Sequence, residues 1–137
     1  MAKRTTTSRR LAVHVARVCA ENRCRDVAVL DLRRLSPVTE FFVVATGTSS
    51  RQMSAAARYV ADGGKALGDA PFGVEGVETS DATAAIRWVL IDFVDVVVHL
   101  FSDASRGYYD LELLWGDAPR VDWQKGWKPR EDAGDAG

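Results

Sequence analysis

The sequence predicts an α/β domain, a mixed β-sheet flanked by helices in the order α-β-β-α-β-β-α. Four nearly continuous apolar runs of strand length occur as two pairs, and such runs are typical of strands buried on both faces of a sheet. Segments with helical apolar spacing precede, separate and follow the two pairs. Because helices and strands mix along the chain, we expect one sheet covered by helices.

The length and charge of the chain are those of one ordinary globular domain. A chain of 137 residues suits a single domain, and a net charge of -1 gives no general attraction to nucleic acid or anionic membrane. We expect residues 1–8 to form a flexible basic arm, residues 9–121 the domain, and residues 122–137 a largely disordered tail. Neither a membrane-spanning run nor a signal peptide is recognisable, which favours a cytoplasmic location.

The first helix is predicted over residues 9–22. Thr7 or Ser8 can cap its start and Asn22 is a plausible stop, whereas His14 lies off the apolar stripe and is expected to be solvated. The stripe consists of Leu11, Val15, Val18 and Cys19.

The two cysteines and two histidines do not form a recognisable metal site. Cys19 and Cys24 are five residues apart, which is neither a CxxC motif nor half of a known zinc pattern. Cys19 is expected to be a small apolar core residue, and both thiols are expected to be reduced. We therefore expect neither metal nor cofactor.

Two strands and a second helix follow. Strands are predicted at Val27–Leu32 and Phe41–Thr46, with Ser36-Pro37 breaking the chain between them. A helix of about 18 residues then begins near Ser50. Its glycine pair, Gly63-Gly64, costs about 1 kcal/mol per glycine relative to alanine, so its end is expected to fray or to stop early.

The last third of the chain is predicted to contain a loop, a hairpin and a helix. Residues 69–87 are interpreted as loop, and the small polar part VETSDATAA as its mobile portion. Strands at Trp88–Phe93 and Asp95–Phe101 are expected to join tightly, and a helix capped by Asp103 or Ser105 is expected to reach Trp115. Trp123 and Trp127 in the tail either fold back on the domain or are exposed.

The segment TGTSSRQ (Thr46–Gln52) admits two interpretations. A glycine after a strand, before a helix N-terminus, can hold a phosphate. However, neither GxxxxGK[ST] nor GxGxxG is present. The spacing of Ser49 and Gln52 matches a capping box, in which Gln52 returns to the N–H of Ser49. We therefore favour a helix start over a nucleotide site.

The alternative function is a Mg²⁺-dependent nucleotidyltransferase that uses this loop with Asp92 and Asp95 as the metal-binding carboxylates. These two aspartates flank a tight hairpin and need not converge, while Asp31 lies on another strand. Nucleophilic catalysis is poorly supported because His99 stands among apolar strand residues, away from any nucleophile elbow. Trp88, at a strand end beside Arg87, is instead of a type that anchors protein interfaces.

Four segments together carry a resemblance to a known family. They are DVAVLDLRRLSPVTEFFVVATGTSSRQ, FGVEG, RWVLIDFVDVVVHLF and SRGYYDLELLWGDAPRV. In this order they resemble the ribosome silencing factor (Iojap-like) family over about residues 8–121. The resemblance implies a nucleotidyltransferase-like fold without enzymatic activity.

The resemblance also implies a partner and a mechanism. The partner is the large ribosomal subunit, bound through universal large-subunit ribosomal protein fourteen on the face that meets the small subunit. A factor on that face blocks subunit joining and represses translation initiation under nutrient limitation. The resemblance further implies a homodimer when free, and Arg87 or the basic arm is expected to add a minor, salt-dependent contact with ribosomal RNA.

Matching the family pattern residue by residue gives the expected contact set. The family's tryptophan, its DVVVH strand and its last helix correspond to Trp88, Asp95, His99, Arg106, Tyr109, Glu112 and Trp115. We add the strand residues Val98 and Leu100 to the expected ribosomal contacts. The chain departs from the pattern twice: Val94 replaces a hairpin glycine, and the loop Val77–Arg87 is longer than usual.

Overall fold

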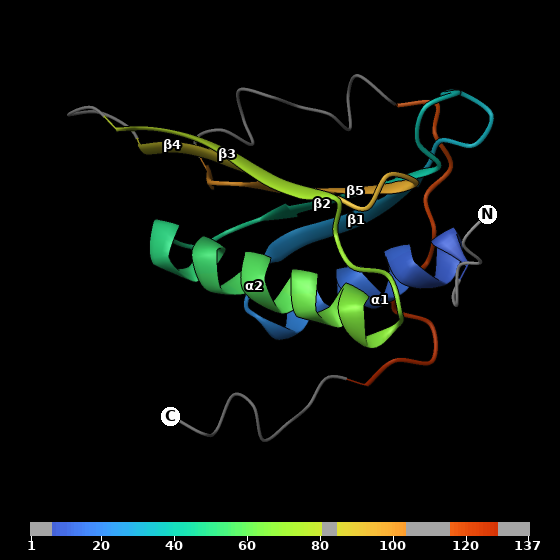
Figure 1. The fold of residues 1–137 in the computed structure, drawn as a ribbon, viewed down its shortest axis with the longest axis horizontal. Coiled ribbons are helices and arrows are strands. Elements are labelled where there is room, and N and C mark those ends of the chain that lie inside the picture. Colours follow the sequence, from blue (N-terminus) through green and yellow to red (C-terminus); the bar gives the residue numbers. More distant parts are fainter. Residues whose placement is uncertain (1–6, 81–84, 104–115, 129–137) are drawn as a thin grey trace.

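The computed structural model describes residues 7–80, 85–103 and 116–128, and shows a five-stranded sheet with two helices packed on one face (Figure 1). Both helices are amphipathic and turn their apolar stripes toward the sheet. The elements in chain order are α1 (Ser8–Glu21), β1 (Arg25–Asp31), β2 (Phe41–Thr46), α2 (Ser50–Ala66), β3 (Gly73–Ser80), β4 (Ala85–Asp92) and β5 (Val96–Phe101). Neither helix is long and apolar enough to cross a membrane.

The sheet is mixed, as the sequence predicts. Its strand order is β1-β2-β5-β4-β3, with β2 and β5 parallel and the other three neighbouring pairs antiparallel. The connection from β2 to β5 passes through α2 and the β3–β4 hairpin, so the two apolar pairs of the sequence meet at the centre of the sheet.

Both faces of the central strands are buried, which confirms the interpretation of the apolar runs. Side chains alternate along each strand, so successive residues enter different clusters. The helix side is the larger core, where Leu11 and Val15 of α1 and Met53 of α2 pack on the sheet. The opposite face carries a second cluster, formed by Leu30, Leu32, Phe42, Val44, Trp88, Phe101 and Ala118.

The prediction of a loop at residues 69–87 is wrong over most of its length. Residues Gly73–Ser80 form β3, which pairs with β4 in register from Gly73↔Asp92 to Ser80↔Ala85. Glycine and glutamate have low intrinsic strand propensity, but the hydrogen bonds offered by β4 override it. Residues Val77–Arg87, expected to form a loop, therefore belong to a hairpin whose tip, residues 81–84, lies outside the described residues.

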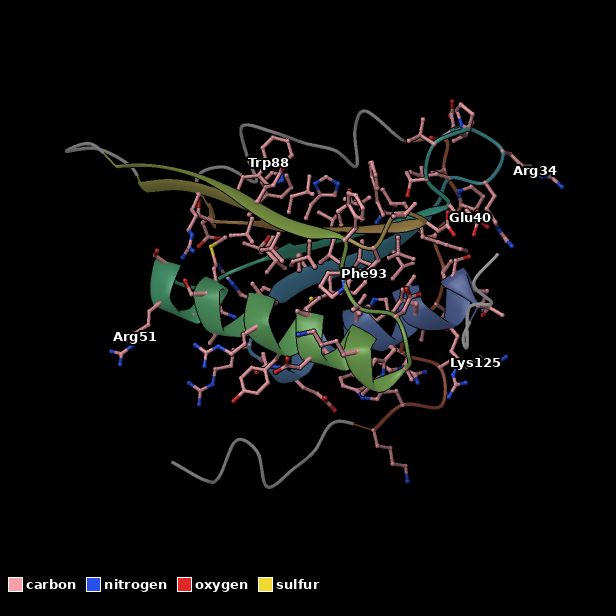
Figure 2. All side chains as sticks on the ribbon, in the orientation of Figure 1. Arg34, Glu40, Arg51, Trp88, Phe93 and Lys125 are labelled. Atoms are coloured by element: carbon pink, nitrogen blue, oxygen red, sulfur yellow. The ribbon has the colours of Figure 1, made fainter. Side chains whose placement is uncertain are left out.

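The glycine pair does not end α2 early, because the helix continues to Ala66. Gly64 is buried, and a Cβ at this position would come within 2.3 Å of Phe93 Cε1 and 2.7 Å of the Asp69 carbonyl. Phe93 fills the space between sheet and helices (Figure 2). The close approach of Phe93 therefore explains a glycine that helix propensity disfavours.

His14 also differs from expectation. It is half-buried on α1 near Gly63 of α2, where a Cβ on Gly63 would lie 3.3 Å from its Nε2. Burial lowers the pKa of His14 below its ordinary value, although Glu21 partly offsets this. The histidine packs between the helices because α2 approaches α1 closely at its glycines.

The segment 122–128, which the sequence assigns to a disordered tail, has defined contacts and folds back along α1 (Figure 1). The Trp123 indole Nε1–H donates to the Val27 carbonyl at 3.1 Å, and Arg17 Nε donates to the Trp123 carbonyl at 2.8 Å. Trp127 packs on Trp123, with ring centroids 5.3 Å apart. Aromatic burial offsets the entropy of ordering this polar segment; residues 129–137 and the predicted helix over 105–115 lie outside the described residues.

A tight turn joins β4 to β5, as expected, and it places Val94 at φ 75°. The N–H of Asp95 donates to the Phe93 carbonyl at 3.0 Å, which makes a γ-turn centred on Val94. The Val94 N–H is held by the Asp92 side chain at 2.7 Å. A β-branched residue is strained at positive φ, so Val94 has a conformational cost in this turn.

Candidate protein-binding face

The candidate site lies on the sheet face opposite the helices, where Figure 2 places Trp88. Trp88 of β4 pairs with Phe101 of β5, and the next residue on the same face, Leu90, pairs with His99. Phe42 of β2 approaches the His99 ring edge-on, with centroids 4.6 Å apart. Because every second side chain of a strand points to the same face, β2, β4 and β5 bring their aromatic side chains together on this face.

Trp88 and His99 are joined by a side-chain hydrogen bond. The indole Nε1–H donates to His99 Nδ1 at 3.1 Å, and the ring centroids lie 5.7 Å apart. The Trp88 ring also packs on Phe101, with centroids 5.1 Å apart. Trp88 therefore holds the histidine ring in one orientation.

His99 is kept neutral by its surroundings. Its side chain is 5% exposed, and burial lowers its pKa from 6.5 to about 4. Because Nδ1 accepts the hydrogen bond from Trp88, the ring proton of the neutral imidazole resides on Nε2. Among the described residues this Nε2 has no hydrogen-bond partner, although it is buried.

A groove of about 450 Å³ runs beside His99 and is called the Val38–Phe72 groove below. Val38, Phe72 and Val94 are 79%, 83% and 51% exposed and lie at its edges. Its remaining lining consists of Ser36, Thr39, Phe42, Leu90, Asp92, Val97 and His99. The Thr39 hydroxyl oxygen is a second buried polar atom here with no partner among the described residues.

The Thr46–Gln52 loop begins a helix, as favoured from its spacing. Ser49 is the N-cap and its hydroxyl accepts from the Gln52 N–H at 3.0 Å. Gln52 returns to the N–H of Thr48 at 2.9 Å, one residue earlier than the predicted Ser49. Its amide nitrogen also donates to the Asn22 carbonyl at 2.6 Å, so the same side chain ties α2 to the end of α1.

Three backbone N–H groups of this loop are already used within the protein. The N–H of Gly47 donates to the Phe101 carbonyl at 2.7 Å, and the N–H groups of Thr48 and Gln52 are used within the cap. A Cβ on Gly47 would come within 2.1 Å of Met53 Cγ, so this glycine permits close packing of α2. The backbone N–H groups of Gly47, Thr48 and Gln52 therefore bond within the domain and are not free to bind a phosphate.

Of the two aspartates of the nucleotidyltransferase alternative, Asp92 uses its carboxylate within the turn, and Asp95 is bonded through its backbone carbonyl. Asp92 accepts from the Val94 N–H, and the Asp95 carbonyl accepts from the N–H groups of Glu40 and Phe41 at 2.8 and 3.0 Å. Within the part of the chain that the structure describes, no group of three or more His, Cys, Asp or Glu side chains could hold a metal ion.

The structure separates the predicted contact residues. Trp88 and His99 share the face opposite the helices, whereas Val98 and Leu100 are 0% exposed in the core beneath the helices. The interpretation of Val98 and Leu100 as partner contacts is therefore wrong for this conformation, because alternate residues of a strand face opposite sides. Arg106, Tyr109, Glu112 and Trp115 lie outside the described residues.

Arg87, expected near RNA, has contacts within the domain. Its guanidinium donates to the carbonyl and the hydroxyl of Ser50, so it joins β4 to the start of α2.

Sequence reasoning missed the edges of the groove. Val38 and Phe72 each follow a proline in a connecting segment, as SPV and APF. A large apolar residue directly after a turn proline was the available signal, since such segments usually run over the surface. Thr39 and Val97 carry no comparable signal.

These features define a class: a small α/β domain in which one sheet face packs on helices and the other carries a largely buried aromatic cluster beside a groove with exposed apolar edges. A family model described as "Ribosomal silencing factor during starvation" matches residues 5–136. The chain belongs to this family of regulatory proteins.

Individual relatives agree with this assignment. The Bacillus subtilis ribosomal silencing factor RsfS is 39% identical over 107 residues, covering 78% of this chain and 86% of that protein. A crystal structure of a Chromobacterium violaceum protein superposes with a TM-score of 0.71 at 33% identity, covering 91% of this chain and 92% of the other. A mouse protein named "Mitochondrial assembly of ribosomal large subunit protein 1" is 31% identical over 98 residues, covering 69% of this chain and 40% of that protein.

Proposed function

We propose that this protein binds the large ribosomal subunit through universal large-subunit ribosomal protein fourteen and sterically prevents joining of the small subunit. The consequence is repression of translation initiation under nutrient limitation. The observation that carries this proposal is the family match over residues 5–136, whose description names ribosomal silencing during starvation. The name of the mouse relative, which refers to the ribosomal large subunit, supports the choice of subunit.

The described face supports binding to a protein. Interfaces derive most of their affinity from a few aromatic and apolar anchors surrounded by a polar rim. Trp88 and Phe72 are anchors of this kind, and the Val38–Phe72 groove extends the face beyond them. Repression by occupancy needs only binding and bulk, without catalysis.

We further propose that the free protein is a cytoplasmic homodimer.

Co-sedimentation with isolated large and small subunits, followed by a subunit-joining assay, tests this function. The expected result is binding to large subunits and a reduced yield of joined ribosomes in proportion to occupancy. Binding to small subunits alone, or binding to large subunits without any effect on joining, would contradict the proposal.

Trp88→Ala adds a test of the face. We expect affinity to fall by about 2–4 kcal/mol, which is roughly 30- to 1,000-fold. Because Trp88 also packs on Phe101, the melting temperature must be measured in parallel and binding assayed well below it. Tyr59→Ala is the matched control, since Tyr59 is an aromatic residue, 54% exposed, on α2. A loss of about 3–5 kcal/mol in folding stability with unchanged binding would make Trp88 a packing residue only.

A further inference from the structure

We propose that the Val38–Phe72 groove is a docking site for an apolar side chain of a protein partner, with a backbone carbonyl of that partner accepting from His99 Nε2–H. This inference rests on the proposed function in taking the partner to be a protein of the large subunit. It adds a contact surface that includes Val38, Thr39 and Phe72.

The first argument is the concentration of exposed apolar surface. Val38 and Phe72 are more exposed than any other large apolar side chain described in the structure, and both line this groove. They come from different connecting segments, after Pro37 and after Pro71, and converge beside β4 and β5. Exposed apolar side chains are ordinary when scattered singly, but gathered around a concavity they mark an interaction site.

The second argument is the pair of unsatisfied polar atoms in the same groove. His99 Nε2 and the Thr39 hydroxyl oxygen are buried without a hydrogen-bond partner among the described residues, and both residues line the groove. Buried polar groups are nearly always paired, and an unpaired one needs an explanation. A partner that brings an acceptor for His99 Nε2–H supplies that explanation.

Charge decides the chemistry of the occupant. Among the described residues, the groove lining contains Asp92 and no lysine or arginine, and burial keeps the His99 imidazole neutral while its Nδ1 accepts from Trp88. A phosphate would meet a carboxylate without any compensating cation, so a nucleic-acid backbone does not fit. A peptide segment fits, since it offers an uncharged carbonyl acceptor beside an apolar side chain.

The groove is also continuous with the Trp88 surface. His99 contacts both, through its hydrogen bond to Trp88 on one side and its place in the groove lining on the other. A partner that covers Trp88 can therefore extend into the groove without leaving the sheet face. The volume of about 450 Å³ is within the range of clefts that hold specific ligands.

The test compares Phe72→Ala combined with Val38→Ser against Tyr59→Ala in co-sedimentation with isolated large subunits. All three positions are more than half exposed, so folding should be preserved and can be verified by circular dichroism. We expect the double variant to lose about tenfold or more in affinity. We expect Tyr59→Ala to stay within about twofold of the unmodified protein. Binding by the double variant within twofold of the unmodified protein overturns the docking site.

A second arm separates protein from nucleic acid as the occupant. The same variants are titrated with protein-free large-subunit RNA and with purified universal large-subunit ribosomal protein fourteen. The expected result is a groove-dependent loss with the protein and no groove-dependent difference with the RNA. A loss confined to the RNA titration overturns the inference.

The hydrogen bond itself has a spectroscopic signature. In proton–nitrogen spectra of the imidazole, the Nε2–H resonance of His99 should move downfield when the purified ribosomal protein is added and not when RNA is added. An unmoved resonance at saturation overturns the His99 part of the proposal. If the unmodified protein fails to bind large subunits at all, the proposed function fails; if it binds and the groove variants bind equally well, only the docking site fails.

Discussion

The indole N–H of Trp88 donates to Nδ1 of His99 diagonally across the β4–β5 pair, with 3.1 Å between the nitrogen atoms. This contact fixes the position of the ring proton and keeps the imidazole from accepting a second proton at Nδ1 without breaking the bond. Both residues are expected partner contacts, and His99 also lines the Val38–Phe72 groove.

The first prediction concerns pH and His99. In the folded protein its pKa is lowered to about 4, against 6.5 in the unfolded chain. Between these values the unfolded chain binds one more proton, so stability is complete above pH 6.5 and falls as the pH is lowered toward 4. The loss is on the order of 3 kcal/mol in the free energy of unfolding, measured by urea denaturation at several pH values.

His99→Gln is the control for this prediction, because it removes the titration while retaining a polar side chain. His14 is present in both proteins, so its own lowered pKa contributes equally. If the variant loses as much stability between pH 7 and pH 4 as the unmodified protein, His99 is not the group responsible.

The second prediction is that Val94→Gly stabilises the protein. Positive φ costs a non-glycine residue about 1–2 kcal/mol, and Val94 sits at φ 75°. Glycine lowers the free energy of unfolding by about 0.5–1 kcal/mol, because it makes the unfolded chain more flexible. The expected net gain is about 1 kcal/mol in urea denaturation, with Val38→Gly as a control at an exposed site. A destabilised Val94→Gly protein would show that the γ-turn is not strained.

The third prediction contrasts two adjacent glycines of α2. Gly64→Ala places a methyl group 2.3 Å from Phe93 and 2.7 Å from a backbone carbonyl, and should cost about 1–3 kcal/mol. Gly63→Ala meets the ends of the Val18 and His14 side chains at 3.2 and 3.3 Å, which can yield, so its effect should be near zero. Thermal denaturation of both variants gives the comparison. Equal stability of the two would rule out the close packing of Phe93 on Gly64.

The fourth prediction concerns Trp123. Trp123→Ala removes packing on the core and the hydrogen bond to the Val27 carbonyl, and should cost about 2–3 kcal/mol. Gln124→Ala serves as control, because Gln124 is exposed in the same segment. Truncation after Asp122 should destabilise the domain by at least as much. A truncated protein of unchanged stability would mean that the segment is an appendage.

Several elements of the fold were predictable because their signals are local. The predicted strands Val27–Leu32 and Phe41–Thr46 are nearly continuous apolar runs. The spacing of Ser49 and Gln52 is that of a helix N-terminus and correctly predicts the start of α2. Strand β3 was missed because its residues become a strand only beside β4. The early end of α2 was predicted wrongly from its glycine pair because the reason for Gly64 is also non-local. A Cβ on Gly64 would clash with Phe93, which lies far along the chain.

The candidate site was predictable only in part. Trp88 and His99 were recognised from the family pattern and lie together. Val98 and Leu100 were grouped with them although the alternation of a strand places both neighbours of His99 on the other face. The Val38–Phe72 groove is formed by segments more than thirty residues apart in the sequence. A local sequence pattern cannot predict that such segments lie side by side.

The edges of the sheet have a consequence for assembly. Along β1, the N–H of Asp31 donates to the Pro119 carbonyl and the N–H of Val121 donates to the Val29 carbonyl, so residues 119–121 occupy the outer side of that strand. Strand β3 is the opposite outermost strand. Backbone groups of Val29 and Asp31 that already bond to residues 119–121 cannot also pair with a strand of another copy. Strand addition along Val29–Asp31 is therefore blocked by the protein's own chain.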